Sequence, residues 1–378
     1  MDSFKVISQN LGSQARLGQL QTPHGTVQTP VFMPVGTRGA VKGITPQQLR
    51  ETGATVVLAN TYHMLLRPGP EIVEQLGGLH KLMAWDGPIL TDSGGYQVFS
   101  LSTLNRIGED GVKFSSHIDG SPIYIDAAVA IRVQNQLGAD IIMCFDECTP
   151  YPCEKEKLQK AVERTLRWAK QCKDAHVNHS QLLFGIVQGG IDLELRSYCA
   201  NELQKIDFDG YAIGGLSVGE GHENMIRTVQ HTAPLLPAEK PRYLMGVGTS
   251  ADIIAAVAAG VDMFDCVLPT RNGRNGTAFT ENGVLKMRNN AHINDTAPIE
   301  EGCDCYCCHN FSRGAVRHFF NVGEMLGPIL LSMHNLHFYQ RLMKNIRKNI
   351  AANTFAGWAK EQIAKYEECA LIHNSVTQ

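Results

Sequence analysis

Short apolar segments alternate with helical stretches along most of this chain, and that alternation constrains the fold more than any other feature. Each segment is only a few residues long and almost uninterrupted in its hydrophobicity, which is typical of strands buried in a parallel sheet. Most of them end in glycine or in a polar residue and lead into a helical pattern. The eight segments are residues 31–36, 55–60, 88–92, 141–146, 183–188, 211–215, 243–247 and 263–267.

Eight strands that alternate with helices predict an α/β chain folded as a (β/α)8 TIM barrel. An open, doubly wound sheet is the alternative, but no G-x-G-x-x-G turn opens an early helix. We expect the barrel to occupy residues 1–275. A hairpin, a metal-binding subdomain and a helical tail packed on the barrel should follow in residues 276–378, with a turn over 272–277. The predicted barrel helices are residues 126–137, 154–176, 192–204, 223–232 and 251–259.

Polar or glycine residues stand where the apolar segments end. In a barrel of this kind the carboxyl ends of the strands surround the active site, so these residues should converge. Asp and Gly also favour turns, which is the simpler reading of any one of them. An unpaired carboxylate beside an apolar core is costly, however, so each acid needs a partner or a task. The residues are Asp92, Asp146, Gln188, Gly214, Gly215, Gly246 and Asp265.

Composition and charge exclude several classes of protein. With 43% hydrophobic and 19% charged residues, the chain is neither disordered nor built to span a membrane. Its first residues carry no secretory pattern, so we expect a cytoplasmic protein. The net charge of −3 excludes a uniformly basic surface, yet residues 271–348 hold ten Lys/Arg against six acidic residues. This stretch fits a surface for a polyanion, or simply a solvated helix face.

Four of the eleven cysteines are clustered, whereas the other seven show no disulfide framework. Free thiols are typical of a reducing compartment. Clustered thiolates followed by a distant histidine suit a closed, structural zinc site. Three thiolates have the spacing C-x-C-x2-C, and spacing alone leaves several candidates for the remaining position. The candidates around this site are Cys303, Cys305, Cys307, Cys308, His309, His334 and His337.

The strand-end acids also fit a glycosidase, in which one carboxylate is the nucleophile and another the acid/base. Gly94 and Gly95, next to Tyr96, would allow a planar ligand to approach the backbone. The residues by themselves therefore indicate a barrel enzyme that acts on a sugar or nucleoside.

Longer motifs carry a more specific resemblance. In their order along the chain they resemble the tRNA-guanine transglycosylases of bacterial type, which exchange guanine for a 7-deazaguanine in the anticodon of tRNA. That family is a (β/α)8 barrel with a zinc subdomain and a pentosyltransferase activity. The matching motifs are residues 91–100, 145–148, 185–190, 213–220, 243–248 and 265–271, together with Cys303, Cys305, Cys308 and His334 as zinc ligands.

The resemblance implies a role for each strand-end residue. Asp265 would attack the anomeric carbon of the wobble ribose, and Asp92 would be the general acid/base at the base. Asp146 would accept hydrogen bonds from the base edge, while Gln188 and the Gly215 N–H hold its carbonyl oxygen. Tyr96, where the family usually has Phe, and Met245 would sandwich the ring, and the Leu216 carbonyl would face its substituent. The implied base-binding residues are Asp92, Ser93, Gly94, Gly95, Tyr96, Asp146, Gln188, Gly215, Leu216 and Met245.

The resemblance also implies partners: tRNA with a G-U-N anticodon, guanine and a 7-deazaguanine base, and a second copy of the chain in a homodimer. Cys148 and Val218 match the bacterial pocket for 7-aminomethyl-7-deazaguanine, the intermediate of queuosine biosynthesis. The alternatives are a non-catalytic RNA-binding subunit and a hydrolytic glycosidase. The implied RNA-binding residues are Gly246, Val247, Gly248, Thr249, Ser250, Ala251, Asp252, Thr270, Arg271, Asn272, Gly273 and Arg274.

Overall fold

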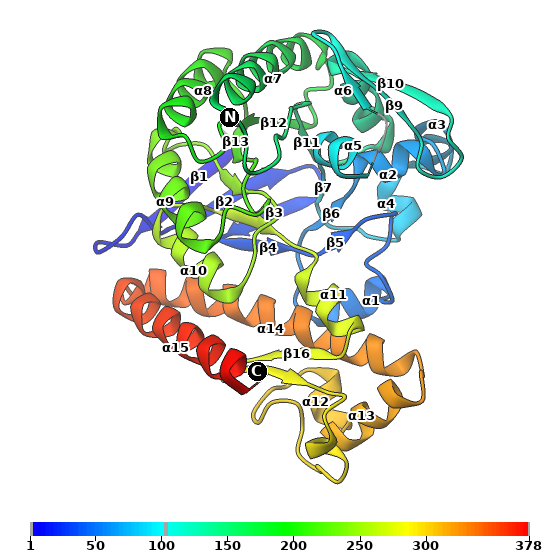
Figure 1. The fold of residues 1–378 in the computed structure, drawn as a ribbon, viewed down its shortest axis with the longest axis vertical. Helices are drawn as coiled ribbons and strands as arrows, with labels where there is room; N and C mark the ends of the chain where they lie inside the picture. Colours follow the sequence, from blue (N-terminus) through cyan, green and yellow to red (C-terminus); the bar gives the residue numbers. More distant parts are fainter. Residues whose placement is uncertain (1–2, 102–104, 377–378) are drawn as a thin grey trace.

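A parallel β-barrel wrapped by helices forms the centre of the computed structural model, which describes residues 3–101 and 105–376; residues 1–2, 102–104 and 377–378 lie outside it (Figure 1). All eight predicted strands are confirmed. The first is divided at Pro34, which has no N–H to donate; its halves pair with the last and the second strand and so close the barrel. In sheet order the strands are β4 (Val31–Met33), β15 (Met263–Asp265), β14 (Arg242–Leu244), β13 (Gly210–Ile213), β12 (Leu182–Val187), β11 (Ile141–Met143), β7 (Ile89–Thr91), β6 (Val57–Ala59) and β5 (Val35–Gly36).

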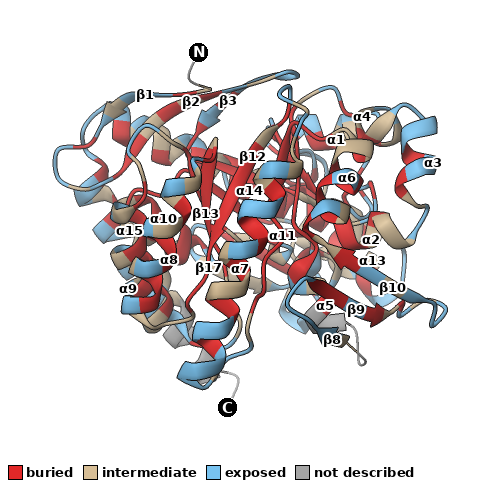
Figure 2. Cartoon of the chain, turned by 90° about the horizontal axis from the view of Figure 1, so that it is seen from above, coloured by how far each residue is buried: buried red, intermediate tan, exposed pale blue. Residues whose placement is uncertain are grey.

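The five predicted barrel helices are confirmed to within two residues at each end. Side chains that cap their first turns fix several of the starts: Asp126 accepts from the N–H of Val129, and Asp192 accepts from the N–H of Leu195. Figure 2 shows the buried strands at the centre and the exposed faces of the helices outside them. These helices are α6 (Ala127–Leu137), α7 (Lys155–Ala175), α8 (Leu193–Ile206), α9 (His222–Thr232) and α10 (Ser250–Ala258).

Two antiparallel sheets were not predicted. The first closes the amino-terminal end of the barrel, where Phe4, Leu20 and Val27 join the apolar side chains of the barrel interior. It consists of β1 (Phe4–Gln9), β2 (Arg16–Thr22) and β3 (Gly25–Thr29). The second consists of β8 (Asn105–Ile107), β9 (Gly111–Ser115) and β10 (Pro122–Asp126). Shorter helices in this half are α1 (Pro46–Glu51), α2 (Thr61–Leu66), α3 (Pro70–Gln75), α4 (Gly78–Met83) and α5 (Gly95–Leu101).

The segment after the last barrel strand corrects one prediction. Residues 272–274 are not a turn but the end of α11 (Leu268–Arg274), because Pro269 suits the first turn of a helix. Gly273 allows close packing on α14 (Leu326–Ala351), since an added Cβ would lie 2.8 Å from the Cα of Ser332. The predicted hairpin follows as β16 (Thr277–Thr280) and β17 (Gly283–Lys286). The remaining helices are η1 (Ala233–Leu235), η2 (Asn290–His292), α12 (Tyr306–Asn310), α13 (Arg313–Asn321) and α15 (Phe355–Val376).

Helix α14 lies between the barrel and the part of the carboxy-terminal extension that holds β16, α12 and α13 (Figure 1). Its buried side chains contact both parts, which makes it the main connection between them. None of the helices in the described part of the chain combines the length and the hydrophobicity that a membrane crossing requires.

Candidate active site

The strand-end residues meet around one cleft of about 550 Å³ at the carboxyl end of the barrel. The convergence expected from the barrel prediction is therefore observed. Gly94 and Gly95 do not line the cleft, although their N–H groups bond to the side chains of Asp92 and Ser93. The predicted base-binding or catalytic residues that line the cleft are Asp92, Ser93, Tyr96, Asp146, Gln188, Gly215, Leu216, Met245 and Asp265.

Asp92 follows β7 directly and is held by three donors. The Asn60 amide and the Gly94 N–H, at 3.2 Å, bond to its carboxylate, and the N–H of Thr61 lies 2.8 Å from Oδ1. Burial raises the pKa of Asp92 to about 7; the N–H of Thr61 opposes this shift and the nearby Asp265 adds to it. A carboxyl group with this pKa can both give and take a proton near neutral pH.

Asp265, the last residue of β15, has a different environment. Its Oδ1 accepts from the hydroxyl of Tyr243 at 2.5 Å and from the N–H of Gly246 at 2.7 Å. Its Oδ2 has no hydrogen bond to the described residues, so one carboxylate oxygen is fixed and the other is available. Burial raises the pKa of Asp265 above its ordinary value, against the opposing effect of these two donors. This arrangement suits a nucleophile.

Asp146 and Gln188 form a polar pair deeper in the cleft. Asp146 accepts from Ser93 Oγ at 2.6 Å and from Gln188 Nε2 at 2.7 Å. Gln188 Oε1 is buried and has no partner in the described part of the chain. Gly215 has φ +63°, and a Cβ there would lie 2.2 Å from Gln188 Oε1. Since buried polar groups in native proteins are normally satisfied, these atoms mark a place for a polar ligand.

Tyr96 and Met245 offer apolar surface to the same cleft. Tyr96 is 49% exposed, which is unusual for a large aromatic residue, whereas Met245 is partly buried. Rings and thioethers of this kind suit the faces of a planar ligand. Cys148 and Val218 also line the cleft.

The predicted RNA-binding residues divide into two groups. Those lining the cleft are Gly246, Gly248, Thr249, Asp252 and Arg271, and the Arg271 side chain is exposed. The Asp252 carboxylate is engaged, since it accepts from Thr249 in the cap of α10. The others lie outside the cleft lining: Val247, Ser250, Thr270 and Gly273 are buried, while Ala251, Asn272 and Arg274 are partly buried.

Two residues that position the acids were missed as functional by the sequence analysis. Asn60 ends a predicted strand, as Asp92 does, so the same strand-end signal could have found it. Tyr243 lies within an apolar segment, and nothing in its neighbourhood distinguishes its hydroxyl from that of a core tyrosine.

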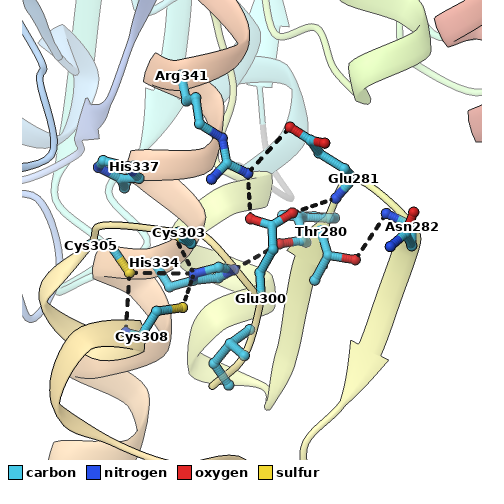
Figure 3. A network of polar contacts seen from close by, with 12 residues as sticks. Thr280, Glu281, Asn282, Glu300, Cys303, Cys305, Cys308, His334, His337 and Arg341 are labelled. Atoms are coloured by element: carbon cyan, nitrogen blue, oxygen red, sulfur yellow. Dashed lines mark hydrogen bonds and ion pairs between the residues drawn. The ribbon is translucent and has the colours of Figure 1, made fainter. Parts of the chain in front are cut away.

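A second group of side chains could hold a metal ion in the extension: Cys303, Cys305, Cys308 and His334 are all buried, and their ligand atoms lie within 4.8 Å of one another (Figure 3). His334 Nδ1 lies 3.9, 3.5 and 3.4 Å from the three sulfurs in that order. A tetrahedral zinc ion, with bonds of about 2.3 Å to sulfur and about 2.05 Å to nitrogen, separates such ligands by about 3.5 Å. The donor set therefore fits zinc in both chemistry and spacing.

The geometry also chooses among the candidate ligands. Cys307 is buried outside the group, and His309 is exposed. His337 pairs with Asp304 at 2.8 Å. His334 Nε2 lies 2.8 Å from the carbonyl oxygen of Phe279, an outer contact that orients the ring with Nδ1 toward the sulfurs.

Known proteins are similar in sequence to this chain over nearly its whole length. A family model described as queuine tRNA-ribosyltransferase matches residues 11–368. The chain belongs to this family. Relatives named queuine tRNA-ribosyltransferase include those of Desulforamulus reducens, 55% identical over 92% of this chain and 94% of the relative, and of Nitrosomonas europaea, 54% identical over 92% and 94%. That of Francisella tularensis subsp. novicida is 52% identical over 94% and 96%.

Membership in the queuine tRNA-ribosyltransferase family makes this chain an enzyme that transfers a pentosyl group in tRNA processing. The family implies tRNA and a guanine-type base as substrates. The predicted resemblance is thereby confirmed.

Proposed function

We propose that this enzyme exchanges guanine at the wobble position of tRNAs with G-U-N anticodons for 7-aminomethyl-7-deazaguanine, within queuosine biosynthesis. The exchange is a double displacement through a covalent enzyme–RNA intermediate. The observation that carries the proposal is the pair of acids in one cleft. One carboxylate oxygen of Asp265 has no hydrogen bond to the described residues, and burial raises the pKa of Asp92 to about 7.

In the first displacement, Asp265 Oδ2 attacks C1′ of the wobble ribose. The bond between C1′ and the guanine nitrogen breaks as an ester bond to Asp265 forms, and Asp92 gives its proton to the leaving base. In the second, Asp92 takes a proton from the incoming base, whose nitrogen attacks C1′ and releases Asp265. Two inversions retain the configuration at C1′.

The polar pair deeper in the cleft selects the base. Asp146 accepts from the N1–H and amino group, and Gln188 Nε2 donates its second hydrogen to the carbonyl oxygen together with the N–H of Gly215. Such a site rejects analogues without these groups, because its own buried polar atoms are then left unpaired. Tyr96 and Met245 pack on the two faces of the ring. Further contacts come from Ser93 and the Leu216 carbonyl, with Cys148 and Val218 beside the 7-substituent. Gly94 and Gly95 act indirectly, through their N–H bonds to Asp92 and Ser93.

RNA binding is assigned to the loops around the cleft. The target base must leave the stack to reach Asp265, which is easier in an anticodon loop than in a duplex. In this proposal the segments 246–252 and 270–274 contact the RNA through their exposed and cleft-lining residues, with exposed Arg271 and neighbouring Arg274 near phosphates. Affinity for tRNA is then expected to fall as salt rises. A flat salt response in a filter-binding assay would contradict the assignment.

The cofactor of the extension is proposed to be one structural Zn²⁺ per chain, held by the Cys303, Cys305, Cys308 and His334 group. When bound, zinc would link the segment that carries the three cysteines to α14 and leave no coordination position for a substrate. We further propose a barrel domain over residues 1–275, an extension over residues 276–378, a homodimer and a cytoplasmic location. None of the eleven cysteines, all of which lie in the described part of the chain, forms a disulfide bond, which supports the last point.

The deciding experiment is exchange of labelled guanine into unmodified tRNA by the wild type and by Asp265→Asn. Incorporation by the wild type, with none by the variant, is the expected result. Asp207→Asn serves as the matched control, because Asp207 is exposed at the end of α8 and its positive φ suits Asn. A folded, zinc-loaded wild type that incorporates nothing would instead favour the non-catalytic RNA-binding subunit.

A further inference from the structure

A second group of potential metal ligands lies at the opposite, amino-terminal end of the barrel. His24 lies in the turn between β2 and β3, His80 in α4, and Asp140 directly before β11. The Asp140 side chain is fully buried. Its backbone is fixed between two barrel strands, since its N–H bonds to the carbonyl of Ile89 and its carbonyl accepts from the N–H of Leu182.

Both histidines point a ring nitrogen at this one carboxylate. His24 Nδ1 lies 2.8 Å from Asp140 Oδ1, and His80 Nε2 lies 3.1 Å from Oδ2. The two rings stack with their centroids 3.6 Å apart and an interplanar angle of 20°. His24 is 42% exposed at its side chain, so water can reach the group from the hairpin side.

These separations fit the ligands of a single ion. Nitrogen and oxygen ligands about 2.0–2.1 Å from a metal, on neighbouring coordination positions, lie about 2.9–3.4 Å from each other. The candidate ligand atoms of the three residues all lie within 4.8 Å of one another. Backbone N–H groups hold the carboxylate in place, from His24 at 3.1 Å and from Ile89 at 2.8 Å, as outer contacts do in metal sites.

We propose that His24, His80 and Asp140 form a second metal site, for a divalent first-row ion such as Zn²⁺, separate from the three-cysteine group. Imidazole and carboxylate ligands are the set that such ions prefer, with water in the remaining positions. The bound ion joins the β2–β3 hairpin to α4 and to the start of β11. It thereby secures the sheet that closes this end of the barrel, and it takes no part in the chemistry of the cleft.

The test is a calorimetric titration of the full-length protein with ZnCl₂, after metal analysis has shown one zinc equivalent in the three-cysteine group. We expect the wild type to bind one further equivalent. His24→Ala and His80→Ala should each weaken that binding by about tenfold or more, since even outer contacts of metal ligands contribute this much. His179→Ala is the matched control, because His179 is exposed and outside the group. Asp140 is left intact because its carboxylate also holds two backbone N–H groups.

A second readout separates a bound ion from a hydrogen-bonded cluster. Excess Zn²⁺ should raise the melting temperature of the wild type and of His179→Ala, but not that of His24→Ala, because only a ligand of the native state stabilises it. A wild type that never exceeds one equivalent would overturn the proposal. A further equivalent of zinc that is still bound when His24→Ala and His80→Ala are combined in one variant would also overturn it.

Discussion

Replacing Tyr243 with Phe tests the proposed nucleophile without disturbing the fold. The ring is buried and fully packed, so the loss is confined to the hydroxyl that donates to Asp265 Oδ1 at 2.5 Å. A hydrogen bond to a charged group contributes about 1.5–3 kcal/mol. If that stabilisation is used to keep Asp265 ionised and oriented, base exchange at neutral pH should fall about 10- to 150-fold.

The same substitution should also shift the pH dependence of the activity in a definite direction. The Tyr243 hydroxyl favours the ionised form of Asp265, so its removal raises the pKa of Asp265 further. An attacking carboxylate must be ionised, and activity is lost as pH falls through its pKa. The acid limb of kcat/KM should therefore move to higher pH in Tyr243→Phe, and the loss of rate should shrink as pH rises.

The assay is labelled-guanine exchange measured across pH, with Tyr211→Phe as the control. Tyr211 is also a buried barrel tyrosine, but its hydroxyl accepts from the N–H of Phe208, and the residue is not part of the cleft lining. A Tyr243→Phe profile that superimposes on the wild type would refute the reasoning. A loss of rate that is equal at every pH, with the acid limb unmoved, would refute the argument that the hydroxyl acts by keeping Asp265 ionised.

Three further predictions concern the acid/base, the base pocket and the metal. Because Asp92 must be protonated to release guanine, formation of the covalent intermediate should decline as pH rises through about 7. Asp92→Asn should abolish this alkaline decline and lower the rate by about 10²- to 10⁴-fold. Gly215→Ala should raise KM for guanine about 5- to 150-fold, since a Cβ at φ +63° meets Gln188 Oε1 at 2.2 Å and such strain costs about 1–3 kcal/mol. Cys308→Ser should lose the metal and melt at lower temperature, whereas Cys307→Ser should keep it.

All three predictions have a contrary outcome, and two have a matched control: Gly357→Ala for the base pocket and Cys307→Ser for the metal. Gly357→Ala adds a Cβ in α15 with nothing within 4 Å, so it should leave KM unchanged. An alkaline decline that persists in Asp92→Asn would remove that residue as the acid. An unchanged KM in Gly215→Ala would argue against base binding at this position, and metal retained by Cys308→Ser would reverse the choice of ligand.

The barrel was predictable because its signal repeats. Eight apolar segments of similar length, most of them ending in a polar or glycine residue, fit few architectures besides a barrel. The convergence of the acids follows because the carboxyl ends of parallel strands meet at one end of the barrel. The sheet of β1–β3 was not predicted, since only a few of its side chains enter the interior, among them Phe4 and Leu20. Asn272 and Gly273 suggested a turn from their types, yet packing on α14 keeps them helical.

The candidate metal site shows where spacing along a chain stops being informative. Cys307 and Cys308 are neighbours, and either one could complete the pattern begun by Cys303 and Cys305. The choice depends on α12, whose cap is Cys305 and whose turn directs adjacent side chains about 100° apart. Only Cys308 then faces the same point as His334. Three-dimensional direction, rather than residue type, decides the ligand set.

Helix α14 explains how a metal bound by the Cys303, Cys305, Cys308 and His334 group would affect the proposed base exchange, although these residues do not line the cleft. His334 belongs to the metal group. The next residue, Asn335, donates to the carbonyl of Pro269 in α11 and to that of Thr277 at the start of β16. Little more than one turn later, the hydroxyl of Tyr339 donates to the carbonyl of Gly248. The same loop contains Gly246, whose N–H donates to the carboxylate of Asp265. One rigid helix thus joins the metal group to the support of the nucleophile. Loss of the metal should therefore reduce the rate through the position of that loop, although the ion contacts no reacting atom.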